Sequence, residues 1–423
     1  MIARKFSTLS AFLLLLSAAP LASAQEFFLK KGDVVVMMGD SITEQRLYSN
    51  YVEMWSQTRF PSYNLVFRNV GIGGDTSGGG NGRFKRDVLT HKPTVLTVDF
   101  GMNDGRYTAF SDKTFDPYMK GLTGIANQAK EANIRVAWIT PQPVEHKPGD
   151  KAETYNLTLE KFGDGVKQIA EKNNGLFVDQ FHPYWSVIEK ARKDGEKGRI
   201  TSGDAVHPGP PGQAMMAAAI LKGMNFPKLV SSAEVTIGAM SAKEKGQNCF
   251  VIGVAAKSNT VTFERLDLSL PFFPESAKSI LKWTPLVEDM NEYGLKVVGL
   301  DAGKYDVKLG GKKVAKYSSE ELAKGVNLAE AALAAGPVAD QVKDVVKAIT
   351  DKTNYYHGQI YSPLVLGRGL AKDPGLKDVA KEDLAKRRDA LIAERMTKMP
   401  EYDAAIRKAL EPRKHSVEVV LSK

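Results

Sequence analysis

The sequence has little cysteine and no long apolar stretch. Cys249 is the one cysteine among 423 residues, so an intrachain disulfide is excluded. The apolar run Ala11–Leu16 near the N-terminus is too short to cross a bilayer, and we expect no transmembrane segment in the mature chain. Basic residues exceed acidic ones, 58 to 49, but the lysines of the C-terminal third are spread out rather than clustered. This spread is typical of solvated helix surfaces, so we expect no nucleic-acid partner.

The first residues have the pattern of a secretory signal peptide. Arg4 and Lys5 precede the apolar run, and Ala22-Ser23-Ala24 supplies the small residues of a cleavage site. We expect residues 1–24 to be removed by cleavage before Gln25, which leaves a periplasmic or extracellular protein. No cysteine stands at the cleavage site, so a lipid anchor is not indicated. Loss of these two basic residues would lower the formal net charge of +9 by two.

Residues 25–232 alternate strand-like and helix-like segments. Such alternation predicts βαβ units and a parallel sheet covered by helices on both faces. Because the crossovers are right-handed, the loops that follow the strands are expected along one edge of the sheet. The expected strands are Val34–Met38, Asn64–Val70, Val95–Phe100, Ile134–Ile139 and Leu176–Val178, and the expected helices are Phe115–Ala132, Tyr155–Lys172 and Gln213–Met224.

The remainder of the chain divides by composition. Residues 233–317 are rich in β-branched residues and turn signals, which predicts a small β-rich, sandwich-like module with a hairpin around Gly310-Gly311. Residues 318–423 are expected to be mainly helical, beginning at the capping-box pattern Ser318-Ser-Glu-Glu321. The alternating stretch Ser416–Leu421 is compatible with a final returning strand.

Four loops after the predicted strands carry side chains suited to nucleophilic chemistry. Ser41 follows the first strand in Gly39-Asp40-Ser41, and a glycine-rich loop spans 69–80 after the second. Asn103 follows the third strand, and Asp204 stands three residues before His207 after the last. Taken singly, each has an ordinary interpretation, such as an N-cap serine, a flexible turn or an Asx turn. Together they bring a serine, a histidine and a carboxylate to one edge, which are the parts of nucleophilic acyl transfer.

These four stretches resemble, in order, the signature blocks of the SGNH, or GDSL-type, hydrolases over residues 33–224. The resemblance implies a three-layer, flavodoxin-like α/β fold with a parallel sheet, and neither a metal nor an organic cofactor. It implies that Ser41 is the nucleophile, His207 the general base and Asp204 the residue that orients the base. The implied oxyanion hole consists of the Ser41 N–H, the Gly74 N–H and the Asn103 side chain.

Two further stretches leave alternatives open. Asp179-Gln-Phe-His182 repeats the spacing of the acid and the histidine, so it is an alternative base pair or a metal site with His207. We favour a helix entry, with Pro183 in the first turn and Tyr184-Trp185 packing inward. The segment Asn354–His357 either approaches the active site or packs locally, and local packing is the favoured interpretation.

The predicted function is an exported serine esterase that cleaves small acyl esters on a carbohydrate, with acetyl as the expected acyl group. The loop Gly73–Gly82 has no large apolar side chain before Phe84, and no contiguous apolar stretch beside the four blocks offers a channel for a long acyl tail. The expected partner is an acetylated polysaccharide or cell-wall glycan. The alternatives are a lipase or lysophospholipase, an acyl-thioesterase of the same fold, and a non-catalytic carbohydrate-binding protein.

Overall fold

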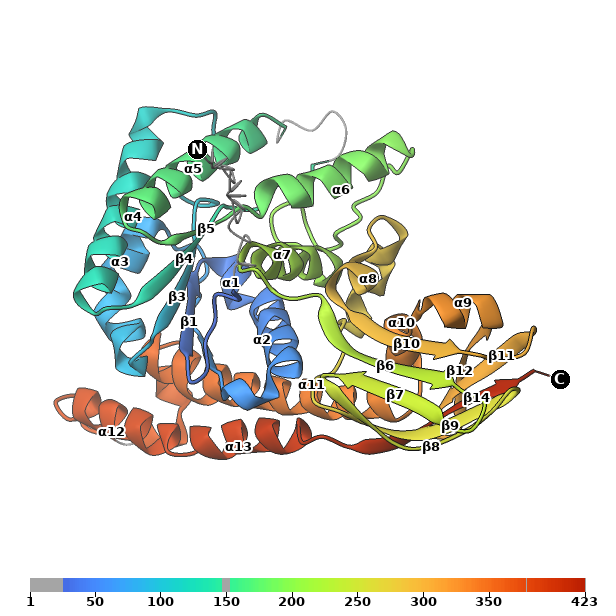
Figure 1. The fold of residues 1–423 in the computed structure, drawn as a ribbon. Helices are drawn as coiled ribbons and strands as arrows, with labels where there is room; N and C mark the ends of the chain where they lie inside the picture. The colour runs from blue at the N-terminus through green and yellow to red at the C-terminus, as the bar shows by residue number, and fades with distance from the viewer. Residues whose placement is uncertain (1–25, 147–152, 378, 423) are drawn as a thin grey trace, which may run out of the picture.

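The computed structural model describes residues 26–146, 153–377 and 379–422. The predicted signal peptide lies outside these residues. A parallel α/β unit is followed by two further sheets, and the C-terminal helices run back beneath the α/β unit (Figure 1). In the described ranges no helix is both long enough and apolar enough to span a membrane.

The parallel sheet has the strand order β2-β1-β3-β4-β5. Every neighbouring pair in it is parallel, with Val35 opposite Val95 between β1 and β3. This order and direction are those of the flavodoxin-like fold, so the predicted fold class is confirmed. The strands are β1 Val34–Gly39, β2 Val66–Asn69, β3 Val95–Asp99, β4 Arg135–Ile139 and β5 Leu176–Val178.

Helices cover both faces of this sheet and make it the middle of three layers (Figure 1). Val35 and Met37 of β1 belong to one buried cluster, whereas Val36 and Met38 belong to another, because successive strand side chains point to opposite faces. One face carries α2 Leu47–Arg59, α6 Phe181–Lys193 and α7 Pro210–Gly223, and the other carries α3 Ser77–Asp87, α4 Asp112–Glu131 and α5 Glu153–Lys172.

Helix α3 differs from the sequence-based expectation. Ser77 to Gly80 were expected in a glycine-rich loop, but they form the first turn of α3, capped by Thr76. The glycines serve close packing instead. A Cβ on Gly80 would lie 2.7 Å from the ring of Phe100, and one on Gly121 of α4 would lie 2.3 Å from the Ser77 Oγ. Glycine therefore lets α3 approach both β3 and α4.

Two sheets follow the α/β unit, in the orders β13-β10-β6-β7 and β12-β11-β14-β9-β8. The expected hairpin is present as β11 and β12, which turn at Gly310 and Gly311, both with positive φ. The last strand, β14, does return, and it pairs between β9 and β11. The strands are β6 Leu229–Ile237, β7 Ala242–Gln247, β8 Cys249–Lys257, β9 Thr260–Asp267, β10 Glu292–Val298, β11 Lys304–Leu309, β12 Lys312–Ser318, β13 Val326–Asn327 and β14 Lys414–Leu421.

The C-terminal helices connect these sheets with the α/β unit. The capping box at Ser318 is present, and Glu321 completes it at the start of α9. Helix α11 contacts α2 and continues directly into the π-helix η4, while α13 returns along α11 (Figure 1). The helices are α8 Leu286–Met290, α9 Ser319–Lys324, α10 Ala329–Ala334, α11 Pro337–Tyr355, η4 Tyr356–Val365, α12 Leu384–Met396 and α13 Met399–Ala409.

Candidate active site

Ser41 lies where β1 ends and the short helix α1 Ser41–Glu44 begins. Asp40 caps this helix by accepting a hydrogen bond from the Ile42 N–H at 2.9 Å. The turn needs a glycine before it, because a Cβ on Gly39 would lie 2.1 Å from the Thr43 Oγ1 and 2.6 Å from the Asp99 carbonyl oxygen. The serine therefore stands at the C-terminal edge of the sheet, where α/β folds bind ligands.

His207 and Asp204 lie in the loop before α7 and meet Ser41 across 166 residues of sequence. The Ser41 Oγ is 2.9 Å from the His207 Nε2, and the His207 Nδ1 is 3.1 Å from the Asp204 Oδ2. Asp204 Oδ1 also accepts the backbone N–H groups of Val206 and His207, each at 2.7 Å. Desolvation opposes ionisation of Asp204, but these N–H groups outweigh it and lower the pKa of the carboxyl.

The expected oxyanion-hole residues lie in adjacent loops. Gly74 has φ +75°, which favours glycine, and in the described part of the chain no hydrogen bond engages its backbone N–H. The Asn103 Nδ2 donates to the Asp75 carbonyl oxygen at 3.0 Å. The hydroxyl of Tyr107 donates to the Asn103 Oδ1 at 3.2 Å, which orients the amide so that its nitrogen faces the Gly74 loop.

Buried carboxyl groups lie beneath this edge. Burial raises the pKa of Asp40 to about 7 and that of Asp104 to about 6, and burial also raises the pKa of Asp99 well above its usual range. The Asp104 Oδ1 accepts both the N–H and the hydroxyl of Ser77, at 2.9 and 2.8 Å. Asp104 therefore ties the loop that carries Asn103 to the start of α3, and hence to the loop that carries Gly74.

The alternative acid–histidine pair lies elsewhere. The His182 Nδ1 is 2.7 Å from Asp179 and its Nε2 is 3.2 Å from Glu160, with 62% of the His182 side chain exposed. The pair stands at the start of α6, as a helix entry, and Tyr184 is buried as expected. Among the described residues, no group of three or more His, Cys, Asp or Glu side chains is arranged to hold a metal ion.

Residues from the C-terminal region reach the site, which corrects part of the interpretation of 354–357. Tyr355 packs against Tyr402 and Tyr356 packs against His91, but the His357 Nε2 lies 3.6 Å from the Glu44 Oε1. The guanidinium of Arg368 also contacts the Glu44 carboxylate. Arg368 was not among the residues singled out from the sequence, because no local motif marks it.

A large cleft is lined in part by Gln45, which lies four positions after Ser41 in the sequence. It has a volume of about 990 Å³ and is also lined by residues of α2 and α11, among others. Its walls include the apolar side chains of Leu47, Met54, Phe273, Leu281, Val342 and Val346. No apolar channel beside the motifs was expected from the sequence. The walls of this cleft come from segments almost 300 residues apart, so no contiguous apolar stretch marks it.

Comparison with known proteins assigns the α/β unit to a family. Residues 37–215 match the GDSL-like lipase/acylhydrolase family. An acetylxylan esterase from Geobacillus stearothermophilus is 26% identical to this chain over 216 residues, which cover 46% of this chain and 95% of the relative. The match spans nearly the whole of that relative, so the second half of this chain has no counterpart in it.

Solved structures extend the comparison. One, described as a gut microbial diltiazem-metabolizing enzyme, is 23% identical and matches 93% of this chain and 98% of its own with a TM-score of 0.77, which shows a shared overall fold. A crystal structure of the Geobacillus stearothermophilus acetylxylan esterase covers 47% of this chain and 97% of its own, at 25% identity and a TM-score of 0.41. Residues 37–215 thus form a GDSL-like lipase/acylhydrolase domain, and the chain is a carboxylic ester hydrolase.

Proposed function

We propose that this chain is an exported serine esterase that removes acetyl groups from a carbohydrate. The proposed roles are Ser41 as nucleophile, His207 as general base and Asp204 as the residue that orients the base. The observation that supports them most directly is the 2.9 Å contact between the Ser41 Oγ and the His207 Nε2. Export rests on the signal-like pattern of residues 1–24.

The proposed reaction follows from this geometry. The His207 Nε2 takes the hydroxyl proton as the Ser41 Oγ attacks the ester carbonyl, while the Nδ1–H bond to Asp204 stabilises the imidazolium. The N–H groups of Ser41 and Gly74 and the Asn103 amide are the proposed donors to the oxyanion. His207 then gives its proton to the departing alcohol. Water, activated by the same histidine, hydrolyses the acyl-enzyme and restores the serine.

Two observations support an acetylated carbohydrate as substrate. The curated relative that covers the α/β unit is an acetylxylan esterase. In addition, the Tyr107 side chain, 51% exposed, lies next to Asn103 and offers an aromatic surface of the kind on which a sugar ring packs. The expected partner is thus a polymeric, acetylated glycan.

The roles are tested by substitution and turnover of p-nitrophenyl acetate. Ser41→Ala and His207→Ala should each lower kcat/KM by at least about 10³-fold, and the double variant should be little worse, because the residues act as a unit. His182→Ala is the matched control, since it removes a histidine paired with an acid at the same spacing, and it should keep its activity. Full turnover by the Ser41 variant would contradict the proposal.

The apolar cleft, which Gln45 lines in part, favours a second candidate, an esterase for longer acyl chains. A chain-length series of p-nitrophenyl esters separates the two. An acetyl esterase should show its highest kcat/KM with acetate or butyrate. A channel for the tail would instead stabilise binding by about 0.8 kcal/mol for each buried methylene, so that kcat/KM rises steadily towards decanoate. Release of acetate from acetylated xylan then tests the carbohydrate directly.

A further inference from the structure

The carboxylate of Glu44 holds the loop that carries Gly74. Glu44 is the last residue of α1, three positions after Ser41, and its Oε2 accepts the Gly73 N–H at 2.5 Å. A Cβ on Gly73 would lie 3.0 Å from this oxygen and 4.0 Å from the Ser41 Cβ, so the loop lies directly against α1. The Glu44 carboxylate therefore holds the peptide between Ile72 and Gly73, which directly precedes the peptide that carries the Gly74 N–H.

The position of Glu44 is in turn set from the far end of the chain. The Arg368 Nη1 contacts the Glu44 Oε1 and its Nη2 lies 3.4 Å from the Oε2, which is the forked arrangement that arginine makes with a carboxylate. Burial alone would raise the pKa of Glu44. The nearby His357 imidazole, the Arg368 guanidinium and the Gly73 N–H together outweigh burial and lower that pKa to about 2, so Glu44 is ionised.

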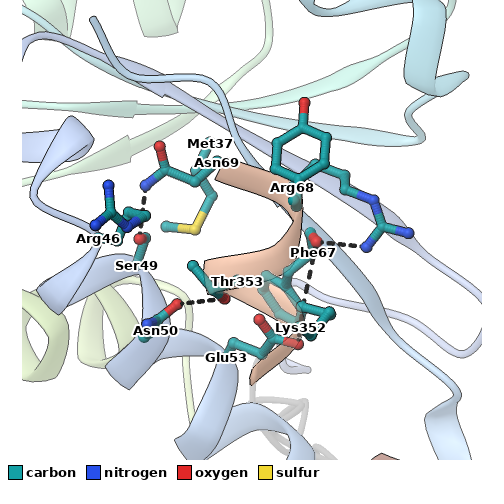
Figure 2. Close-up of a pocket in the computed structure, with 11 residues that line it drawn as sticks. Met37, Arg46, Ser49, Asn50, Glu53, Phe67, Arg68, Asn69, Lys352 and Thr353 are labelled. Atoms are coloured by element: carbon teal, nitrogen blue, oxygen red, sulfur yellow. Dashed lines mark hydrogen bonds and ion pairs between the residues drawn. The ribbon is translucent and has the colours of Figure 1, made fainter. Parts of the chain in front are cut away.

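The segment that carries Arg368 is anchored to the α/β unit. Lys352 of α11 makes a buried ion pair with Glu53 of α2, and the Thr353 hydroxyl donates to the Asn50 Oδ1 at 2.9 Å (Figure 2). Helix α11 continues into η4, and the N–H of Arg368 donates to the Ser362 carbonyl oxygen of η4 at 3.0 Å. The same helix pair, α1 and α2, thus carries the nucleophile and receives the C-terminal anchor.

We propose that Arg368 is a positioning residue for ester hydrolysis. It acts through Glu44 to hold the Gly73–Gly74 loop, so that the Gly74 N–H is directed at the oxyanion. The inference rests on the proposed function. It assigns the C-terminal region a role in catalysis, because this region supplies a positioning residue that the α/β unit lacks. The rival explanation is that the ion pair only fastens the C-terminal region to the protein.

Arg368→Ala is the test, with Arg413→Ala as the matched control. Both arginine side chains are 46% exposed and both pair with a carboxylate, but Arg413 pairs with Asp344, at 2.7 Å, away from Glu44. With p-nitrophenyl acetate, Arg368→Ala should lower kcat by about 10- to 100-fold and change KM by less than about threefold, because misplacing a group by 1 Å can cost about 10²-fold. Arg413→Ala should leave both constants unchanged.

A double-mutant cycle separates positioning from fastening. Glu44→Ala should lower kcat at least as much as Arg368→Ala, and the double variant should be no worse than Glu44→Ala, since both act on the same N–H group. Arg368→Lys should recover part of kcat. An unchanged kcat in Arg368→Ala, with Ser41→Ala inactive, would overturn this inference alone. Full activity of Ser41→Ala would overturn the proposed function and this inference with it.

Discussion

The buried ion pair between Lys352 and Glu53 gives a quantitative prediction about stability. Each side chain is 3% exposed, and the lysine ammonium also donates to the Phe67 carbonyl oxygen at 3.3 Å (Figure 2). Lys352→Met removes the cation and leaves the carboxylate of Glu53 buried without its charged partner. Burial raises the pKa of Glu53 even in the presence of Lys352, whose charge acts in the opposite direction. Without Lys352, Glu53 must bind a proton in the folded protein.

The cost of that proton depends on pH. Since the ordinary pKa of a glutamate is 4.5, protonating Glu53 costs less than about 1 kcal/mol at pH 5 and about 5 kcal/mol at pH 8, at 1.36 kcal/mol per pH unit. The sign follows from proton binding. The folded variant holds a proton that the unfolded chain has released, so the free energy of unfolding falls as pH rises above 4.5. The neighbouring charges Arg68 and Asp403 oppose each other in their effect on Glu53 and leave this sign unchanged.

Urea unfolding at several pH values measures the effect. We expect Lys352→Met to lose about 3 to 5 kcal/mol at pH 8, the range for breaking a buried pair, and about 1 kcal/mol at pH 5. The double variant Glu53→Leu/Lys352→Met removes both charges, so its loss should be smaller at pH 8 and independent of pH. A loss in Lys352→Met that is below about 1 kcal/mol at pH 8, or that does not vary with pH, would refute the reasoning.

Two further predictions concern the site itself. Because the pKa of Asp40 is raised to about 7, the folded protein binds a proton that the unfolded chain lacks between pH 4 and 7, and this part of its stability is lost as pH rises. Asp40→Asn keeps the acceptor for the Ile42 N–H, so its melting temperature should match that of the parent at pH 4 and exceed it at pH 8. Equal melting temperatures at pH 8 would contradict this. Tyr107→Phe removes the hydroxyl that orients Asn103, and it should lower kcat by about 3- to 10-fold with KM unchanged, a fraction of the loss for removing an oxyanion donor. A larger change in KM than in kcat would show that the hydroxyl binds substrate instead.

The sequence predicts the α/β sheet well because its strands are continuous apolar runs. Val34–Met38 is buried on both faces, and no polar residue interrupts it, so its type and length are evident without a structure. Helix α3 was missed because its first turn is Ser77-Gly-Gly-Gly, a composition that is poor for helices in general. In the folded chain, α3 packs so closely against β3 and α4 that its first turn requires glycine. This packing cannot be recognised from the local sequence.

The residues around the nucleophile also fall into two groups, those that a local motif marks and those that it does not. Ser41 and Asn103 each follow a strand directly, and the Asp204–His207 pair lies in a short motif before α7, so local patterns mark all of them. Arg368 has no such motif, and it meets Glu44 across 324 positions of sequence. A contact of that kind depends on how the C-terminal helices pack, which no local pattern encodes.

Two glutamine side chains connect the histidine loop with the lining of the apolar cleft, and they bear on the proposed size of the acyl group. Gln45 lines the cleft, and its Oε1 accepts a hydrogen bond from the Gln213 Nε2 at 2.6 Å. The same nitrogen lies 3.3 Å from the carbonyl oxygen of Pro208, which follows His207, and Gln213 is fully buried. The two amides thus form a polar link between the histidine loop and the residue that follows α1. An acyl tail that displaced Gln45 on its way into the cleft would leave the buried Gln213 amide without this partner, at a cost of about 1–3 kcal/mol. That cost would offset the gain from burying the first few methylenes, and it therefore supports the proposal of an acetyl ester over a longer acyl chain.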